Sequence, residues 1–231
     1  MKKYLDVLKR CTLFEKVEEE NLEAILGCLG ARSVPYKKNE TVIAEGSPAK
    51  AVGIVLRGEV QIVRNDYYGN RSIVANVEES QIFGESFACA GVESMPVEVV
   101  AVTDTEVMLI DCRKITNSCC NACSFHSQII YNLMKVVAMK NLIFHQKIEI
   151  TSKRTTREKL MTYLLAEAKK NGSRSFTIPY DRQELADYLE VDRSGLSAEI
   201  SKMRREGIIE TKKEYFKLKI NKDFEDSIKK V

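Results

Sequence analysis

The sequence predicts an α+β protein in which an antiparallel β-sandwich or barrel precedes a long helix and a winged helix-turn-helix. Three observations predict this order. Short β-branched runs separated by turn residues fill residues 31–110, and a nearly continuous apolar stretch covers residues 129–144. Two short capped helices followed by a hairpin pattern occupy residues 181–220. At 44% hydrophobic and 30% charged residues, the composition is that of an ordinary globular chain.

The first thirty residues and the following segment differ in apolar spacing. Near-helical spacing predicts short helices, with apolar positions at Leu5, Leu8, Leu13, Phe14, Val17, Leu22, Ile25 and Leu26. Strands are predicted within the β-branched runs, at residues 41–43, 53–56, 60–63, 73–75, 97–102 and 107–110. Turn residues at 45–48, 57–59 and 68–70 separate them, which favours antiparallel pairing.

The long helix has few polar residues. Between residues 129 and 144 only Asn132, Lys135, Lys140 and Asn141 are strongly polar. A helix that is apolar on nearly every side needs more than one covering partner. One face can lie on the barrel and the other on the same helix of a second copy, in a short coiled coil. Burial inside one large domain is the alternative.

A polar break at residues 151–153 suits a hinge. A helix is predicted over residues 154–170 and should end at residues 171–173. Beyond it, Asp181 is expected to cap a helix reciprocally with Glu184. The turn at residues 190–192 should point Val191 into the core, and Asp192 should cap a second helix. That helix would bury one face and expose the other; the inward residues are Leu196, Ile200 and Met203, and the outward ones are Arg193, Ser194, Ser197 and Ala198.

This geometry places the first turns of the second helix in a major groove of double-stranded DNA. Arg193 could grip guanine O6 and N7, and Ser194 and Ser197 could bond several base edges. Arg182 and Lys202 are placed to meet phosphates. Residues 207–220 alternate like the hairpin of a wing. An ordinary helical hairpin with a solvated charged face is the alternative.

The distribution of charge along the chain favours an anionic partner for the C-terminal part. Residues 151–231 carry 19 basic and 14 acidic side chains, whereas residues 1–150 carry 17 and 19.

The pattern Arg-Gln-Glu-Leu-Ala-x-x-Leu-x-Val-x-Arg-Ser at residues 182–194 resembles the cAMP receptor protein/FNR (Crp/Fnr) family of bacterial transcription regulators. The resemblance implies a cyclic-nucleotide-binding-type β-roll (jelly roll) as effector domain over residues 1–123, a dimerisation helix over 124–150 and a winged helix-turn-helix over 151–231. It also implies a homodimer that binds a palindromic operator, a small-molecule effector, and RNA polymerase as a partner. Two positions depart from the family pattern. Ala198 stands where many members carry a base-contacting arginine, and Glu190 stands where a turn glycine is common.

The effector site of the cAMP-binding members is matched only in part. They pair a Gly-Glu dipeptide with a downstream Arg-Ser, and this chain has Gly84-Glu85 but Met95-Pro96. Losing the phosphate's counter-charge costs on the order of 2–5 kcal/mol, so we expect an effector other than cAMP. Gly84-Glu85 can equally be a structural turn whose carboxylate bonds backbone amides. Lys140 and Asn141 could donate to an effector, or Asn141 could fix helix register. No particular cofactor is predicted from the sequence.

A cysteine-rich segment suggests a metal- or redox-sensing alternative. Helical spacing brings Cys119, Cys123 and His126 near one face, with Cys120 beside them. Thiolate and imidazole bind zinc, haem or iron–sulfur clusters. The N-terminal cysteine cluster of the iron–sulfur members is absent, since only Cys11 and Cys28 occur there. Cysteine is also a good core residue, and core packing is the competing interpretation.

Other function classes fit less well. A regulatory module acting on another protein would lack the winged helix. The chain has only two histidines and no Gly-x-Ser-x-Gly or phosphate loop, so we do not expect an enzyme. Without an export signal or a long apolar run, we expect a cytoplasmic protein with no membrane partner and with reduced cysteines.

Overall fold

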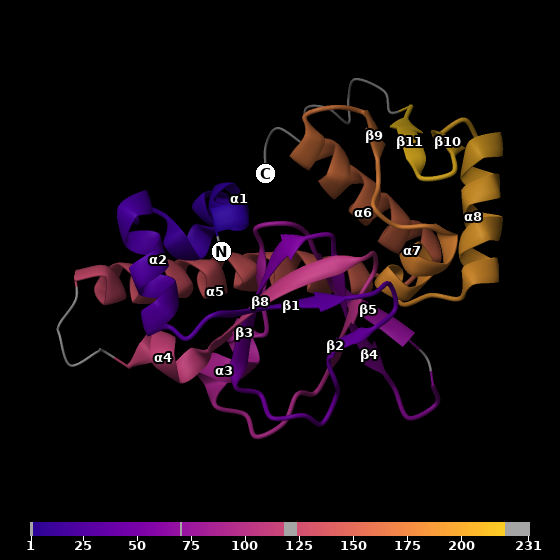
Figure 1. Cartoon of the computed structure of the whole chain (residues 1–231). Helices are drawn as coiled ribbons and strands as arrows, with labels where there is room; N and C mark the ends of the chain where they lie inside the picture. Colours follow the sequence, from indigo (N-terminus) through magenta and orange to yellow (C-terminus); the bar gives the residue numbers. More distant parts are fainter. Residues whose placement is uncertain (1, 70, 118–123, 220–231) are drawn as a thin grey trace. The chain divides into compact units, whose positions relative to one another are not determined.

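The computed structural model describes residues 2–69, 71–117 and 124–219. The chain divides into two compact units, Met1–Leu142 and Ile143–Val231. Within these described residues, the first unit combines helices with two β-sheets, and the second combines helices with a small sheet (Figure 1). The α+β class predicted from the sequence is confirmed.

The first unit begins with short helices. They are η1 (Lys2–Tyr4), α1 (Leu5–Arg10), η2 (Thr12–Phe14) and α2 (Glu19–Cys28). Most of the apolar positions predicted here are buried, and Leu8, Leu13, Leu22 and Leu26 are completely inaccessible to solvent, whereas Leu5 and Val17 are only partly buried.

Two antiparallel four-stranded sheets follow. The first has the order β1 (Arg32–Tyr36), β8 (Thr105–Asp111), β3 (Ala51–Arg57) and β6 (Ile82–Phe83). The second has the order β2 (Thr41–Ile43), β7 (Glu98–Ala101), β4 (Val60–Asn65) and β5 (Arg71–Val77). The antiparallel arrangement predicted from the short strands, and the β-roll that the family resemblance implies, are confirmed.

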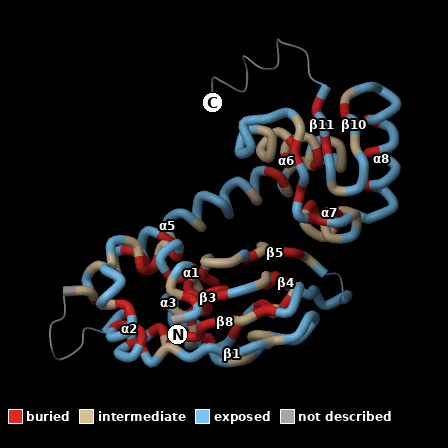
Figure 2. Tube along the Cα trace, turned by 45° about the horizontal axis from the view of Figure 1, so that its top comes forward, coloured by how far each residue is buried: buried red, intermediate tan, exposed pale blue. Residues whose placement is uncertain are grey.

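Alternation along the central strands β3 and β8 divides the core of this unit in two. Ile54 and Met108 belong to the cluster that includes the helical residues, whereas Val55 and Val107 belong to the cluster of residues from both sheets. Successive side chains of a strand point to opposite faces, so the first sheet is covered on both. Figure 2 shows buried residues along these strands.

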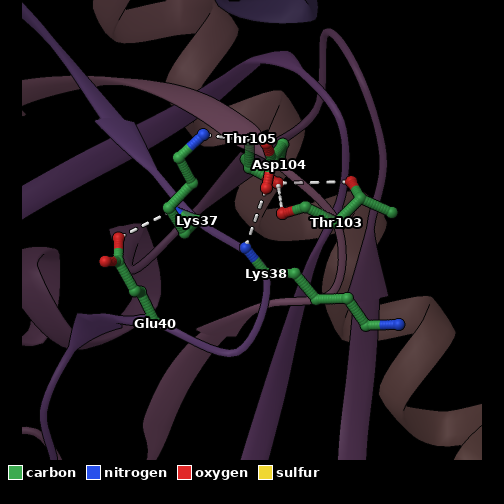
Figure 3. Close-up of polar contacts among 6 residues, drawn as sticks. All are labelled: Lys37, Lys38, Glu40, Thr103, Asp104 and Thr105. Atoms are coloured by element: carbon green, nitrogen blue, oxygen red, sulfur yellow. Dashed lines mark hydrogen bonds and ion pairs between the residues drawn. The ribbon is translucent and has the colours of Figure 1, made fainter.

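A polar cluster fixes one end of the β-roll. The Lys37 ammonium and the Lys38 backbone N–H both donate to the Asp104 carboxylate, at 3.0 and 3.2 Å (Figure 3). Glu40 accepts the Lys37 backbone N–H at 2.6 Å. These contacts tie the turn after β1 to the turn before β8, and so hold the two strands in register at their ends.

Two short helices were not predicted from the sequence. They are α3 (Glu85–Ala90) and α4 (Cys112–Thr116), each of one to two turns. Neither is long enough to show a helical apolar period. The long helix is α5 (Ser124–Thr151), which extends past both ends of its apolar centre. Within the described residues, no helix, α5 included, is apolar enough over a sufficient length to cross a membrane.

The second unit contains α6 (Thr156–Asn171), α7 (Arg182–Leu189), α8 (Arg193–Arg205) and the predicted hairpin of β10 (Ile209–Lys212) and β11 (Tyr215–Leu218). A third strand, β9 (Ser175–Thr177), pairs with β11 and was not predicted, because three residues carry no clear alternation. A capping box between Thr155 and Glu158 begins α6, and Gly172 ends it in the left-handed conformation, as a helix-ending glycine should.

Candidate functional site

The helix pair α7–α8 begins with the predicted capping box. The Asp181 carboxylate accepts the Glu184 backbone N–H at 2.8 Å, and the Glu184 carboxylate accepts the Asp181 backbone N–H at 2.9 Å. These bonds satisfy two N–H groups that the first turn of a helix leaves without partners. They therefore fix the residue at which α7 starts.

The turn between α7 and α8 depends on two lysines that sequence reasoning missed. Lys147 donates to the Tyr188 carbonyl, and Lys159 donates to the carbonyls of Leu189 and Glu190 at 3.2 Å. Positive groups at the last carbonyls of a helix stabilise its C-terminus. Glu190 itself has φ 54° and ψ 56°, the left-handed conformation that favours glycine.

Lys147 is embedded rather than solvated. Its ammonium lies 3.5 Å from the centre of the Tyr188 ring, which stacks on Tyr180 at 4.8 Å. Burial lowers the pKa of Lys147 to about 8. Val191 was expected in the core but is only half-buried. The aromatic rings and the lysine stems, not Val191, support most of this turn.

The second helix starts at the predicted cap. The Asp192 carboxylate accepts the Gly195 backbone N–H at 2.9 Å and the Ser194 hydroxyl. These bonds, that of Ser194 first, lower the pKa of the Asp192 carboxyl. The inward residues are confirmed, since Leu196, Ile200 and Met203 are all buried.

The outer face of α8 carries the predicted contact residues. All of them are exposed: Arg193, Ser194, Ser197, Ala198 and Lys202. Arg193 and Ser194 stand in the first turn, next to the cap, whereas Lys202 stands in the last turn with Arg204 and Arg205. The first turn of α8 is thus polar, and its last turn is basic. Ion pairs of Arg157 with Glu199, at 3.5 Å, and with Glu206 hold α8 on α6.

Arg182 lies apart from this face. Its guanidinium donates to the Thr211 hydroxyl and the Lys213 carbonyl at 3.1 Å and lies 5.0 Å from the Phe216 ring centre. Burial lowers its pKa. The side chain expected to reach a phosphate thus ties α7 to the wing. The wing turn offers exposed cations of its own, at Lys212 and Lys213.

The expected effector residues divide into separate groups in the β-roll unit. Gly84 has φ 78°, and a Cβ there would lie 2.8 Å from the Ala51 carbonyl oxygen, so both conformation and space require glycine. Glu85 is 1% exposed and pairs with Lys140 of α5 at 2.9 Å. Its other partner is the Ser86 hydroxyl, also at 2.9 Å, rather than the backbone amides expected.

The remaining effector candidates do not join this pair. Met95 is 2% exposed and packs in the cluster between the sheets, whereas Pro96 and Asn141 are exposed. Lys140 also donates to the Ile82 carbonyl at 2.5 Å, so its ammonium is held by protein on two sides. The carboxylate that would take a ribose hydroxyl is therefore already paired with a lysine of this chain.

The cysteine–histidine hypothesis falls mostly outside the described residues, because Cys119, Cys120 and Cys123 lie there. His126 is buried, with Nε2 3.2 Å from the Lys114 carbonyl oxygen. It borders an open pocket of about 400 Å³, lined also by Cys28, Asp111, Arg113, Lys114 and Asn117. Within the described ranges, no group of three or more His, Cys, Asp or Glu side chains is arranged so that it could hold a metal ion.

Comparison with known families agrees with this architecture. A cyclic nucleotide-binding domain matches residues 33–119, and a Crp-like helix-turn-helix domain matches residues 158–222. Both modules occur in one chain, in this order. The chain belongs to the Crp/Fnr family. It is accordingly a DNA-binding transcription regulator, as the residue pattern of α7 and α8 predicts.

Individual Crp/Fnr relatives are distant. The transcriptional activator protein FnrL of Cereibacter sphaeroides is 24% identical over 185 residues, which are 75% of this chain and 71% of that protein. The structure of FixK2 from Bradyrhizobium japonicum has 21% identity and a TM-score of 0.65, covering 85% of this chain and 96% of that one. The c-di-GMP-responsive regulator CLP of Xanthomonas campestris has 15% identity and a TM-score of 0.72, covering 88% and 100%. These structures share the fold.

The left-handed turn residue generates a stability prediction. Glu190→Gly should raise the free energy of unfolding by about 1 kcal/mol, because glycine adopts the αL conformation without a Cβ penalty. Urea denaturation measures the change. Glu190→Ala is the matched control, since it removes the same carboxylate but keeps the Cβ. An equal gain in both variants would show that the carboxylate, not the backbone, causes the strain.

Proposed function

We propose that this Crp/Fnr regulator acts as a homodimer that binds a palindromic operator through α8, under control of an effector in the β-roll other than cAMP. The observation that carries the proposal is the outer face of α8. Arg193 is exposed in the first turn of a capped helix whose opposite face is buried. This is the position from which helix-turn-helix proteins reach base edges.

Homodimerisation is supported by the free face of α5. Ile129, Leu133 and Val136 are buried on the β-roll, whereas Tyr131, Met134 and Leu142 are 62%, 65% and 64% exposed. Tyr131, Met134, Ala138, Leu142 and His145 recur every three or four residues and so share one side of the helix. A second copy of α5 would cover this stripe. Twofold symmetry then gives two α8 helices and an operator of two inverted half-sites.

Exclusion of cAMP is supported by charge. A cyclic phosphate needs a cation, and Met95 stands where the cAMP-binding members carry arginine. Glu85 already has Lys140 as its partner. The match to a cyclic nucleotide-binding domain therefore describes the fold of this unit. An effector could enter where Gly84, Glu85 and Lys140 meet, by competing for either charge.

The three functional segments remain those of the family: an effector domain over residues 1–123, a dimerisation helix over 124–150 and a DNA-binding domain over 151–231. RNA polymerase is the further partner that family membership implies. Arg182 contributes to this arrangement by holding the wing. Phosphate contacts then fall to Lys202 and the lysines of the wing turn.

Arg193→Ala should weaken binding to the duplex that the protein selects by roughly 1–3 kcal/mol and relax specificity at one position in each half-site. Lys202→Ala should weaken binding to all sequences alike and lower the salt dependence by about one ion. Fluorescence anisotropy titrations at several salt concentrations measure both. Arg32→Ala, which removes an exposed charge from β1, is the control. Unchanged affinity of the Arg193 variant would refute the assignment of α8.

The double variant Met134→Lys with Leu142→Lys should sediment as a monomer, because like charges would replace apolar contacts along the proposed seam. Analytical ultracentrifugation reads the mass directly. Tyr67→Lys changes another strongly exposed apolar residue away from α5 and should leave the dimer intact. A dimeric double variant, or a monomeric wild type, would contradict the proposal.

Cyclic AMP at millimolar concentration should leave the melting temperature of the protein unchanged. A ligand at a hundred times its Kd would stabilise the fold by about 2.7 kcal/mol, which thermal unfolding detects easily. Lys140→Met frees Glu85 but still leaves the phosphate without a cation, so it should not respond either. A saturable rise in melting temperature with the wild type would overturn the exclusion of cAMP.

A further inference from the structure

Two cysteines that the proposed function does not use lie side by side in the β-roll unit. Cys89 stands near the end of α3 and Cys112 is the first residue of α4. Their sulfur atoms are 3.5 Å apart, which is contact distance for two unbonded thiols. Cys89 is exposed, whereas Cys112 is 4% exposed. One sulfur therefore faces solvent and the other lies behind it.

The sheet holds both thiols in place. The Cys112 backbone N–H donates to the Lys50 carbonyl at 2.9 Å, directly before β3, and Asp111 caps α4 by accepting the Arg113 N–H at 2.9 Å. On the other side, α3 follows β6, which pairs with β3. Both short helices are thus anchored to the same strand. The approach of the two sulfurs is set by the framework of the unit rather than by two mobile side chains.

We propose that Cys89 and Cys112 form a reversible disulfide when the protein meets a hydroperoxide. The Cys89 sulfur attacks the peroxide O–O bond and becomes a sulfenic acid, which releases one water from hydrogen peroxide. The Cys112 sulfur then attacks the Cys89 sulfur and expels the second water. The two sulfurs lose two electrons in total, and the peroxide takes them up with the two thiol protons.

The different environments of the two thiols assign the order of the steps. Oxidants reach the exposed Cys89, and a neighbouring second thiol resolves the sulfenic acid before further oxidation. Burial, followed by the contact with Cys89, raises the pKa of Cys112 and disfavours its thiolate. Cys112 is therefore protected from direct oxidation, and its sulfur, 3.5 Å from that of Cys89, is placed for the second step. The proposed disulfide uses none of Cys119, Cys120 and Cys123.

Oxidation at this site would reach the long helix. Glu85 and Cys89 are four residues apart on α3 and so lie on one face of it. Glu85 holds Lys140 of α5 at 2.9 Å. A disulfide that draws α3 toward α4 therefore acts on the helix that carries this ion pair. We expect the oxidised protein to melt at a different temperature from the reduced protein.

The test uses the whole chain without DNA, so its outcome is independent of operator binding. Reduced protein is treated with hydrogen peroxide, its remaining thiols are alkylated, and it is digested with trypsin. Residues 72–113 contain no lysine or arginine before Arg113, so one tryptic peptide carries Cys89, Cys112 and no other cysteine. The expected product is this peptide, unalkylated and lighter by two hydrogen atoms. Dithiothreitol before alkylation should restore two alkylation sites.

Variants separate this pair from the other thiols. Cys89→Ser and Cys112→Ser should each abolish the mass loss and the melting shift, whereas Cys28→Ser, which removes an exposed thiol on α2, should leave both unchanged. Three results on the wild type would each overturn the proposal. They are a peptide that stays fully alkylated, a Cys89 that gains oxygen without cross-linking, and a cross-link from this peptide to another cysteine.

Discussion

Most of this structure depends on how one face of α5 is bound to the β-roll. Asn132, 1% exposed in the middle of the helix, donates to the carbonyls of Leu13 and Glu15 at 3.0 and 2.8 Å. Leu133, the next residue, and Val136, one turn further along the helix, are buried in the core of the same unit, and Lys140, two turns further along, pairs with Glu85. A buried amide tolerates little rotation, because an unpaired donor costs about 1–3 kcal/mol. The rotation of α5 about its axis is therefore fixed.

This constraint has a functional consequence on the opposite face. Because Asn132 and Lys140 fix the face of α5 that lies on the β-roll unit, the apolar residues Tyr131, Met134 and Leu142 are left exposed elsewhere on the helix. The Glu85–Lys140 pair also couples α5 to α3, and α3 carries Cys89. Any ligand or oxidation event that moves α3 acts on the same ion pair. The proposed regulation needs such a link between the effector domain and the helix proposed to form the dimer.

In the second unit, the features that could be predicted from the sequence are those that depend on interactions between residues close together in the chain. Caps at Asp181 and Asp192, the buried face of α8 and the wing hairpin depend on residues within one helical turn or one hairpin, and all are confirmed. The contacts of Lys147 with Tyr188 and of Arg182 with Thr211 join residues 29 or more positions apart. Contacts between residues so far apart in the sequence leave no periodic pattern. The contacts of Arg182 and Lys147 within the domain were therefore not predicted.

The same division holds in the β-roll. Alternating strands and the Gly84 turn could be predicted, since φ 78° at Gly84 is a local requirement. The partner of Glu85 could not, because Lys140 lies 55 residues away and the same carboxylate could equally have bonded backbone amides. Short elements such as β9 and α3 carry too few residues for a period to show. The sequence thus predicted the secondary structure and the position of α8 better than it predicted the internal ion pairs.

The central claim is that two copies of α8 read an inverted repeat. The most direct measurement is selection of bound duplexes from a fully randomised pool by the full-length protein, followed by sequencing. The account predicts enrichment of two inverted copies of one half-site with centres about 34–36 Å apart, one turn of DNA. Enrichment of a single half-site without its inverted copy, or no enrichment over the starting pool, would contradict it.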